Sequence, residues 1–512
     1  LPRDLNWGRI NLLTYLMVNF EDIFLSQYGR LSFLISSLQF YFSPCMIKYR
    51  EISGLIFLKN LIKELKQLLK IGIPIYGSQI SYMGMGVTDT IVAGRASALD
   101  LSGLAIGNAL SMPFYFLLGG CLFAVTPIVA QLFGAKKYEE IGQKVREILW
   151  VALVLGFIGF ILYRNLSIFI PFFDIEDNIA QISDGYLKAM SFGFVANMLF
   201  TCLRCYSEGM GLTLPVFWVA FIGMLLNIPL DIIFVYGYFG IPPMGGVGCG
   251  IATSINIVIG LFVLILVILK KKEYGPTKLF SKFSGPNTKT TKEALKLGAP
   301  IGFGVFVELS MFSGAALILG SLGAIVISAH TVAINIASVF FILPLSFGLA
   351  AATRIGHLVG EKNLLKAKYA SHVAVLICLV GAVANTIIIL AFREALVSLY
   401  TADVAVIAIA MNLLIFAAIF QIPDGMQMGA LGSLRGYKDT FAPMLMLILT
   451  YWFIALPGGY YLTYHGISSN SLGPAGIWIG MIAGLTAFAC LIIPRLNYIA
   501  NKFIARANPE LP

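Results

Sequence analysis

Charged residues are scarce in this 512-residue sequence, and their scarcity excludes a whole class of protein. Asp, Glu, Lys and Arg together make up 12% of the chain, whereas a typical soluble domain contains about 25%. Hydrophobic residues supply 58%, and the mean hydropathy is +0.87. A soluble globular protein is therefore excluded, and the composition indicates a polytopic membrane protein.

The sequence also lacks the motifs of an enzyme or a metal protein. Neither HExxH nor GxSxG occurs in an apolar run, which argues against a membrane-embedded hydrolase. The seven cysteines form no CxxC pair with a histidine partner, so neither a zinc site nor a disulfide framework is indicated. Cys202 and Cys205 are spaced as CxxC, but they flank Arg204 in an apolar run and are interpreted as packing residues. We expect no cofactor.

The net charge of +10 reflects membrane topology rather than binding of nucleic acid. Basic residues gather in alternate connections between the apolar runs, such as 136–146, 270–292 and 362–368. The other connections carry acidic residues, including Asp100 and Asp403. By the positive-inside rule, the basic connections and both termini lie in the cytoplasm.

Twelve apolar runs are long enough to cross a bilayer as helices. They are 70–94, 103–127, 147–168, 184–205, 214–238, 248–269, 296–319, 327–352, 367–390, 405–430, 441–463 and 475–494. The first six predict an N-lobe over 70–269 and the last six a C-lobe over 296–495, joined by a basic linker at 270–295. Residues 46–69 read as an amphipathic segment on the cytoplasmic surface, and 496–512 as a cytoplasmic tail.

The segment 1–45 differs from the rest of the chain. It begins with Leu1, has no clean apolar span and lacks the pattern of a signal peptide. We expect it to be upstream translated sequence and dispensable, with the native start near Met46 or Met17.

The two predicted lobes repeat one another. LLKIGIPI resembles ALKLGAPI, which pairs Lys70 with Lys296 at an offset of 226 (296 − 70). AQLFGAKK resembles GHLVGEKN, which pairs Lys136 with Lys362 at the same offset (362 − 136). Because each half holds an even number of spans, the copies have the same orientation and are related by an axis along the membrane normal, an arrangement found in secondary transporters. A substrate site is expected in the cleft between them.

Several polar residues fall inside the predicted spans. Glu308 lies about 18 Å along the helix from Lys296, and a charge at such depth costs on the order of 3 kcal/mol, so it should face the protein interior. Asn227 and Asp231 are four residues apart around Pro229 and share a helix face. Asp424 follows Pro423, where we expect a broken helix, and Asp89 lies in the outer half of the first span. These oxygens suit Na⁺, and a desolvated carboxyl can equally carry a proton.

Other side chains are interpreted as packing or as lining a cavity. His330 is expected to form a hydrogen bond between helices. Arg354 and His357, near a cytoplasmic end, are expected to snorkel or to lock loops, and Arg204 is expected to pair with Glu208. The residues that could line an apolar, cation-tolerant cavity are Tyr82, Phe420, Gln421, Met426 and His330.

Taken together, GMGVTDTIVAGRAS, TPIVAQLFGA, FIGMLLNIPLDIIFVYG, GGVGCGIAT, SAHTVAINIAS, RIGHLVGEKN and GSLRGYKD resemble the multidrug and toxic compound extrusion (MATE) family, most closely its bacterial NorM-type branch. The resemblance runs from about residue 65 to 495, in order and on both lobes.

The resemblance implies an all-α, twelve-helix, two-lobed monomer in the bacterial inner membrane. It would export cationic amphipathic compounds in exchange for Na⁺ or H⁺. The cation-site residues that it implies are Glu308, Asp424, Asp89, Asn227, Asp231 and Thr253. One departure concerns Phe420, which stands where NorM-type members often have a Tyr.

Two other functions are weighed against this one. A flippase for a lipid-linked precursor, of related architecture, would favour a basic cavity for phosphate groups, whereas the charges within these spans are acidic. A passive channel is disfavoured by the two-lobed repeat.

Overall fold

The computed structural model describes residues 54–173, 175–466 and 471–507, and these residues are helical apart from short connections. The chain divides into two units, Leu1–Lys63 and Glu64–Pro512. The described part of the first unit is the opening turns of α3 (Gly54–Ala96). The predicted extension 1–45 lies outside the described residues, and the amphipathic segment is described from Gly54, where it is continuous with the first predicted span.

The remaining helices follow the predicted spans closely. They are α4 (Ala98–Leu122), α5 (Val125–Gly134), α6 (Tyr138–Asn165), α7 (Asp177–Gly209), α8 (Thr213–Tyr236), α9 (Gly246–Lys270), α10 (Thr288–Gly320), α11 (Ala324–Gly360), α12 (Leu364–Ser398), α13 (Val404–Gly436), α14 (Phe441–Thr450), the π-helical segment η4 (Tyr451–Ala455), α15 (Leu456–Tyr464) and α16 (Pro474–Ala507). Several carry caps that the sequence supplies: the Asp403 side chain, for example, accepts hydrogen bonds from the backbone N–H groups of Ala405 and Val406 at the start of α13.

Eleven helical segments of the described chain are long and apolar enough to cross a membrane, counting α4 with α5 and α14 with α15 as single segments. The predicted span 70–94 lies in α3, which is not among the eleven. Gly, Ser, Thr and Met fill much of this stretch in place of branched aliphatic residues, and it contains Asp89. The polytopic membrane architecture is confirmed.

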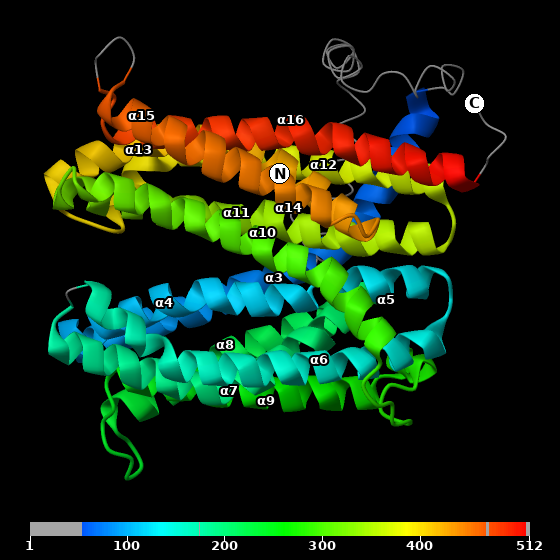
Figure 1. Cartoon of the computed structure of the whole chain (residues 1–512), viewed down its shortest axis with the longest axis horizontal. Helices are drawn as coiled ribbons and strands as arrows, with labels where there is room; N and C mark the ends of the chain where they lie inside the picture. Colours follow the sequence, from blue (N-terminus) through cyan, green and yellow to red (C-terminus); the bar gives the residue numbers. More distant parts are fainter. Residues whose placement is uncertain (1–53, 174, 467–470, 508–512) are drawn as a thin grey trace, which may run out of the picture. The chain divides into compact units, whose positions relative to one another are not determined.

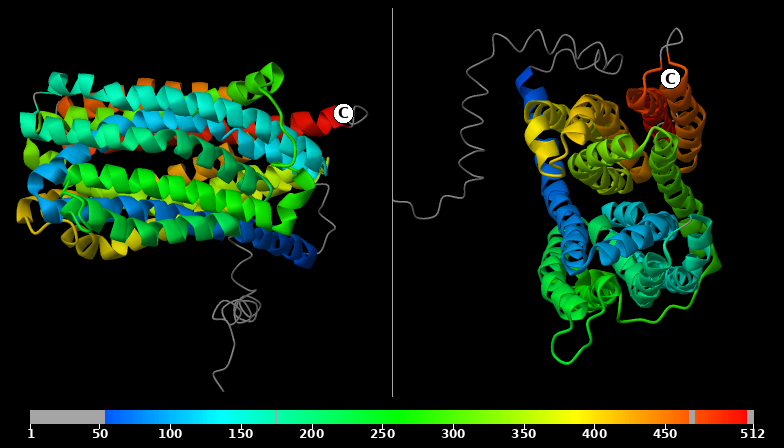
Figure 2. Two further views of the ribbon diagram at one scale, coloured as in Figure 1. Left: turned by 90° about the horizontal axis from the view of Figure 1, so that it is seen from below. Right: turned by 90° about the vertical axis from the view of Figure 1, so that its left-hand side faces the viewer.

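Within residues 64–507 the helices form two lobes. In the first lobe, α7 packs on α4, α6 and α9, and α8 packs on α9; in the second, α13 packs on α11, α12 and α16. Figure 2, right, shows the two groups seen along their helices. The second lobe repeats the packing of the first, since α7 and α13 occupy equivalent central places. The predicted two-lobed fold is therefore confirmed.

The lobes meet along two helix pairs, α4 with α10 and α5 with α11 (Figure 1). Glycines allow the close approach of the first pair: a Cβ on Gly120 would lie 2.3 Å from Cα of Gly302. At the lysine-rich end of the helices, here called the basic end, Gln131 Nε2 donates to Gly436 O at 2.9 Å. The lobes are thus joined at the basic end.

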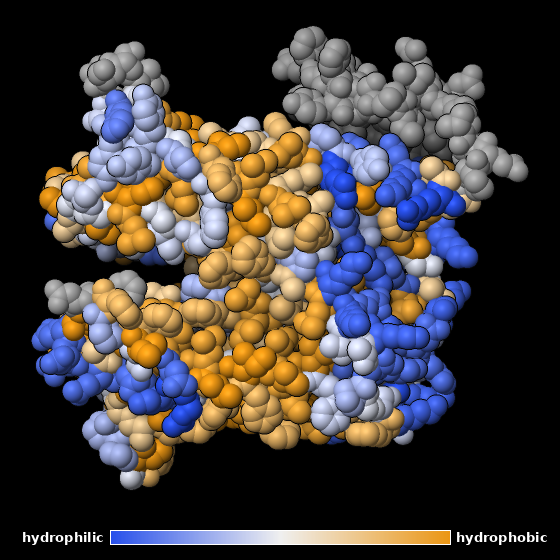
Figure 3. Space-filling view, viewed as in Figure 1, coloured by the Kyte–Doolittle hydropathy of each residue, from blue (hydrophilic) through white to orange (hydrophobic). Residues whose placement is uncertain are grey.

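The opposite end, where α4 and α13 begin, is open between the lobes. Figure 3 shows the surface hollowed there, between α4 on one side and α10 and α13 on the other. An apolar band covers the middle of this face, and hydrophilic residues gather at the basic end. The structure therefore has a cleft between the lobes that opens at one end.

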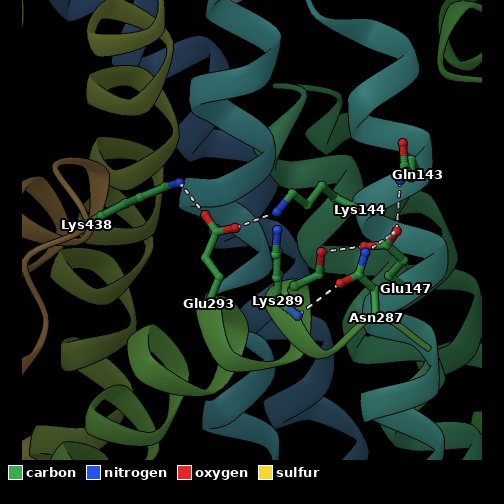
Figure 4. Close-up of polar contacts among 8 residues, drawn as sticks. Gln143, Lys144, Glu147, Asn287, Lys289, Glu293 and Lys438 are labelled. Atoms are coloured by element: carbon green, nitrogen blue, oxygen red, sulfur yellow. Dashed lines mark hydrogen bonds and ion pairs between the residues drawn. The ribbon is translucent and has the colours of Figure 1, made fainter.

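The linker between the lobes is tied to both of them. Glu293 accepts from Lys144 Nζ of the first lobe at 2.6 Å and from Lys438 Nζ of the second at 3.0 Å (Figure 4). Tyr274, in the turn after α9, donates to Ser207 Oγ at 3.1 Å. Burial raises the pKa of Tyr274 to about 12, so its hydroxyl stays a neutral donor.

A second carboxylate of this region, Glu147, lies within α6 and is 3% exposed. It accepts hydrogen bonds from Gln143, from Asn287 and from the Thr290 hydroxyl (Figure 4). The start of α10 is therefore held on the side of α6.

Candidate functional site

Three helices of the first lobe bring polar side chains into one buried cluster. Asn227 Nδ2 on α8 donates to Asp89 Oδ1 on α3 at 2.7 Å and to Asp231 Oδ2 at 2.6 Å. Thr253 on α9 donates to Asp89 Oδ2 at 3.2 Å. Asp89 is 5% exposed, and Asn227 and Asp231 are fully buried. We call these residues, with Asn256, the first cluster.

The geometry of the first cluster follows from helix periodicity and then from packing. Asn227 and Asp231 share one face of α8 because they are four residues apart. Asn256, which the sequence analysis missed, donates to Asn227 Oδ1 at 3.3 Å and to Gly223 O at 3.0 Å. Its spacing of three residues from Thr253 places both on one face of α9, and that spacing was the available signal.

The first cluster is rich in acceptors. Both carboxylates rely on the same amide nitrogen of Asn227. Oδ1 of Asp231 is buried and has no hydrogen-bond partner among the described residues. Two carboxylates in an apolar interior are costly unless positive charge compensates them. The cluster is therefore chemically suited to take up a proton or a small cation.

A second cluster lies in the second lobe, on α13 and η4. Gln427 Nε2 donates to Asp424 Oδ1 at 2.7 Å, and Tyr451 OH donates to Gln427 Oε1 at 2.9 Å. All three side chains are at most 3% exposed. Tyr451 begins the π-helical segment η4, and such segments are frequent at functional sites. Gln427 and Tyr451 were not predicted, although the spacing of three residues between Asp424 and Gln427 was visible in the sequence.

Glu308 faces the same part of the second lobe from α10. It is partly exposed and interacts electrostatically with Asp424 without sharing a hydrogen bond with it. It lines a narrow cavity, with room for a water-sized group, together with Arg435 and Thr440. The other lining residues are mostly apolar: Pro300, Ile301, Gly304, Val305, Leu431, Pro443, Met444 and Leu447.

The expected helix break at Asp424 is wrong. α13 runs without interruption from Val404 to Gly436 with Pro423 inside it, and α8 likewise contains Pro229. A proline removes one hydrogen bond from a helix, and packing on neighbouring helices makes that loss tolerable. α13 is packed against α11, α12 and α16, and it continues as one helix through the proline. The hydrogen-bond partner of the Asp424 carboxylate is therefore a side chain, that of Gln427, and the backbone of α13 is not opened beside it.

The five predicted cavity residues lie apart from the cavity at Glu308. The ring of Tyr82 lies against the Arg204 guanidinium, whose Cζ atom is 5.7 Å from the ring centroid. The aromatic ring of Phe420 packs 6.1 Å from Phe312 and 6.2 Å from Trp478, between centroids. That they line a drug-binding cavity stays a prediction.

The other three predicted cavity residues lie in the second lobe. The ring of His330 lies 5.6 Å from that of Trp478. Gln421 is fully buried and donates to Ala337 O at 3.1 Å. Met426 is partly buried.

At the basic end, the predicted ion pair between Arg204 and Glu208 is confirmed, and Arg354 and His357 form contacts that tie segments together. Arg204 and Glu208 form an ion pair at 3.9 Å. Arg354 donates two hydrogen bonds, each 3.0 Å long, to the carboxylate of Glu64. His357 Nε2 lies 2.8 Å from Gly209 O in the other lobe, so it contributes to the contact between the lobes.

Each lobe thus contains buried carboxylates, and neither cluster resembles a resident metal centre. No group of three or more His, Cys, Asp or Glu side chains that could hold a metal ion occurs in the described ranges.

Comparison with known proteins gives a consistent result. The MatE family model matches residues 74–233 and 300–461. The multidrug resistance proteins NorM of Photobacterium profundum and NorM of Vibrio cholerae are each 38% identical to the chain, over 86% of it and 96% of theirs. PmpM of Pseudomonas aeruginosa is 38% identical over 86% of this chain and 93% of its own.

Solved structures agree on the fold. The eukaryotic MATE transporter AtDTX14 superposes with a TM-score of 0.78 at 19% identity, covering 87% of this chain and 99% of that one. A multidrug resistance MATE family transporter in an outward-facing conformation superposes with a TM-score of 0.79 at 18% identity. This match covers 86% of this chain and 96% of that one.

Proposed function

The chain belongs to the MatE family of multidrug transporters, and from that premise we propose that it exports cationic amphipathic compounds in exchange for Na⁺ or H⁺. Members of this family are transporters and not enzymes. The observation that carries the proposal is the pair of buried acidic clusters, one in each lobe. The cleft between the lobes, which opens at one end, agrees with it.

The orientation of the proposed transporter follows from charge. The basic end carries lysines such as Lys137, Lys278 and Lys362, so the positive-inside rule assigns it to the cytoplasmic side of a bacterial inner membrane. The open cleft then faces outward. Both termini lie on the cytoplasmic side in this orientation.

The clusters support exchange by competition for charge. Without a cation, Asp89 and Asp231 repel each other in an interior that solvates them poorly. A proton, a Na⁺ ion or a cationic drug relieves that cost, and occupation by one weakens binding of another by the same factor in both directions. The membrane potential favours entry of each positive charge from outside by about 2.3 kcal/mol per 100 mV.

The test is equilibrium binding of ethidium, a fluorescent amphipathic cation, to the purified full-length protein. Affinity is measured across Na⁺ concentration at constant pH and ionic strength, and across pH at constant Na⁺. We expect affinity to fall as one of the two ions rises, which also identifies the coupling ion. Affinity independent of both would contradict the proposal. Ethidium efflux from everted vesicles under imposed gradients then measures transport.

A lipid-linked precursor flippase remains the competing function, and the same protein tests it. It would bind a phosphate-bearing lipid in preference to ethidium, because its cargo carries negative charge. The acidic clusters favour the cationic cargo. Stronger binding of the phosphate-bearing lipid would therefore replace the antiporter proposal.

A further inference from the structure

Arg435 is a buried cation that takes part in none of the ion pairs or hydrogen bonds described so far. It lies in the last turn of α13 and is 9% exposed. Its Nε atom has no hydrogen-bond partner within the described part of the chain. A buried guanidinium without a partner is costly, so the side chain needs a compensating charge.

Other arginines in this part of the protein have such a partner. Arg354 pairs with Glu64 at 3.0 Å, and Arg495 pairs with Asp439 at 2.8 Å. Arg435 forms no ion pair with a carboxylate of the described residues. The acid that acts on it is Glu308, which lines the same narrow cavity from α10. Because the cavity walls are mostly apolar, the attraction between the two charges is weakly screened.

The internal repeat shows that this arrangement is particular to the second lobe. By the offsets of 226 and 227, Glu308 corresponds to Tyr82 (308 − 82) and Arg435 to Glu208 (435 − 208). In the first lobe Glu208 pairs with Arg204, whose guanidinium also lies against the Tyr82 ring. The arginine of the first lobe is thus neutralised by its own glutamate. In the second lobe the arginine faces the glutamate proposed to bind the coupling cation.

The charge of the two clusters differs as a consequence. The first cluster contains Asp89 and Asp231, and the hydrogen bonds of its side chains within the described residues include none from a Lys, Arg or His side chain. The second cluster contains Asp424, and the adjoining cavity adds the charges of Glu308 and Arg435. With the acids ionised, their combined formal net charge is therefore a single negative charge, which one monovalent cation neutralises.

We propose that Arg435 is a tethered counter-ion for Glu308, which competes with the coupling cation for that carboxylate. When no cation is bound, the guanidinium moves across the cavity toward Glu308; when a proton or Na⁺ occupies Glu308, it withdraws. Arg435 is thus a positioning residue that weakens cation binding and promotes cation release. This inference rests on the proposed function, because it takes Glu308 as a coupling site.

The experiment measures cation affinity in Arg435→Gln. Purified full-length protein is titrated with NaCl, with choline chloride holding the ionic strength, and separately with pH. Bound ethidium is the readout. Arg435 is the charged group that acts on Glu308. Glu308 acts in turn on Asp424 and on the Tyr451 hydroxyl, and both of these stay in place in the variant. We expect the variant to bind the coupling cation roughly tenfold or more tightly, because a nearby positive charge is gone.

Two further variants separate charge from structure. Arg435→Lys keeps the positive charge and is expected to stay within about threefold of the wild type. Arg495→Gln removes an arginine of the same lobe that is already paired with Asp439, and it should leave the cation titration unchanged. In a Glu308→Gln background, Arg435→Gln should have no effect on cation affinity, because its counterpart has been neutralised.

Each outcome of these experiments supports or overturns the role proposed for Arg435. If Arg435→Gln leaves cation affinity unchanged while the wild type responds to the cation, the inference is wrong and the proposed function stands. If the wild type responds to neither cation, the proposed function itself fails. If Arg435→Gln does not fold alone but folds with Glu308→Gln, the two charges compensate each other as proposed. If Glu308→Gln does not restore folding, Arg435 supports the fold through another contact and the inference is overturned.

Discussion

Two hydrogen bonds at the basic end are expected to hold the lobes in the outward-open state. Gln131 Nε2 donates to Gly436 O at 2.9 Å, and His357 Nε2 lies 2.8 Å from Gly209 O. The donors correspond to each other in the repeat at an offset of 226 (357 − 131), and the acceptors at 227 (436 − 209). The two bonds therefore form one reciprocal contact, and each crosses from one lobe to the other.

Replacing the donors should open this end. A hydrogen bond contributes about 0.5–1.5 kcal/mol net, so Gln131→Ala with His357→Ala removes about 2 kcal/mol from the closed contact. Since a factor of ten corresponds to about 1.4 kcal/mol, the ratio of inward-open to outward-open protein should rise by roughly 30-fold. Each single variant should give roughly fivefold.

The assay is a distance measurement by pulsed electron paramagnetic resonance. Spin labels are placed on cysteines introduced at Lys137 and Glu361, which are exposed at the basic end of different lobes. The double variant should show an added population at longer distance. The control is His372→Ala, because the ring of His372 forms hydrogen bonds with Lys368 O and Asn497 Oδ1 within the second lobe.

The reasoning would be refuted by two results. One is an unchanged distance distribution in the double variant, which would mean that other contacts decide the closure. The other is an equal shift in His372→Ala, which would mean that loss of any buried imidazole loosens the protein.

Three further predictions concern the clusters and the contact between lobes. Glu308→Gln and Asp424→Asn should each abolish ion-coupled ethidium efflux without loss of membrane insertion, because neutral side chains are easier to bury but hold no cation. Transport at the wild-type rate in both variants would contradict this prediction. Asn227→Leu removes the amide shared by the two carboxylates of the first cluster, and should destabilise the cation-free protein by on the order of 1–3 kcal/mol, measured as a lower melting temperature that added coupling ion partly restores. An unchanged melting temperature would contradict that role. Gly302→Leu should prevent folding, because even a Cβ there would lie 2.4 Å from Leu117 O; a normal yield of monodisperse protein by size-exclusion chromatography would show that α4 and α10 can separate.

The sequence by itself determined the class of protein, the order of its spans and the acidic residues that lie within the spans. Long apolar runs, alternating loop charge and an internal repeat are local or periodic signals, so they can be read without coordinates. The same holds for Asn227 with Asp231, whose spacing of four residues places them on one helix face in any packing.

Only the tertiary structure decided which side chains meet across helices. That Asn227 bonds to Asp89, that Tyr451 bonds to Gln427 and that Arg435 and Glu308 line one cavity all depend on how separate helices pack. The predicted helix break at Asp424 was wrong for the same reason, since the packing around α13 maintains the helix through Pro423. Helix periodicity orders residues along one helix, whereas contacts between helices arise from the fit of whole surfaces, which no short stretch of sequence contains.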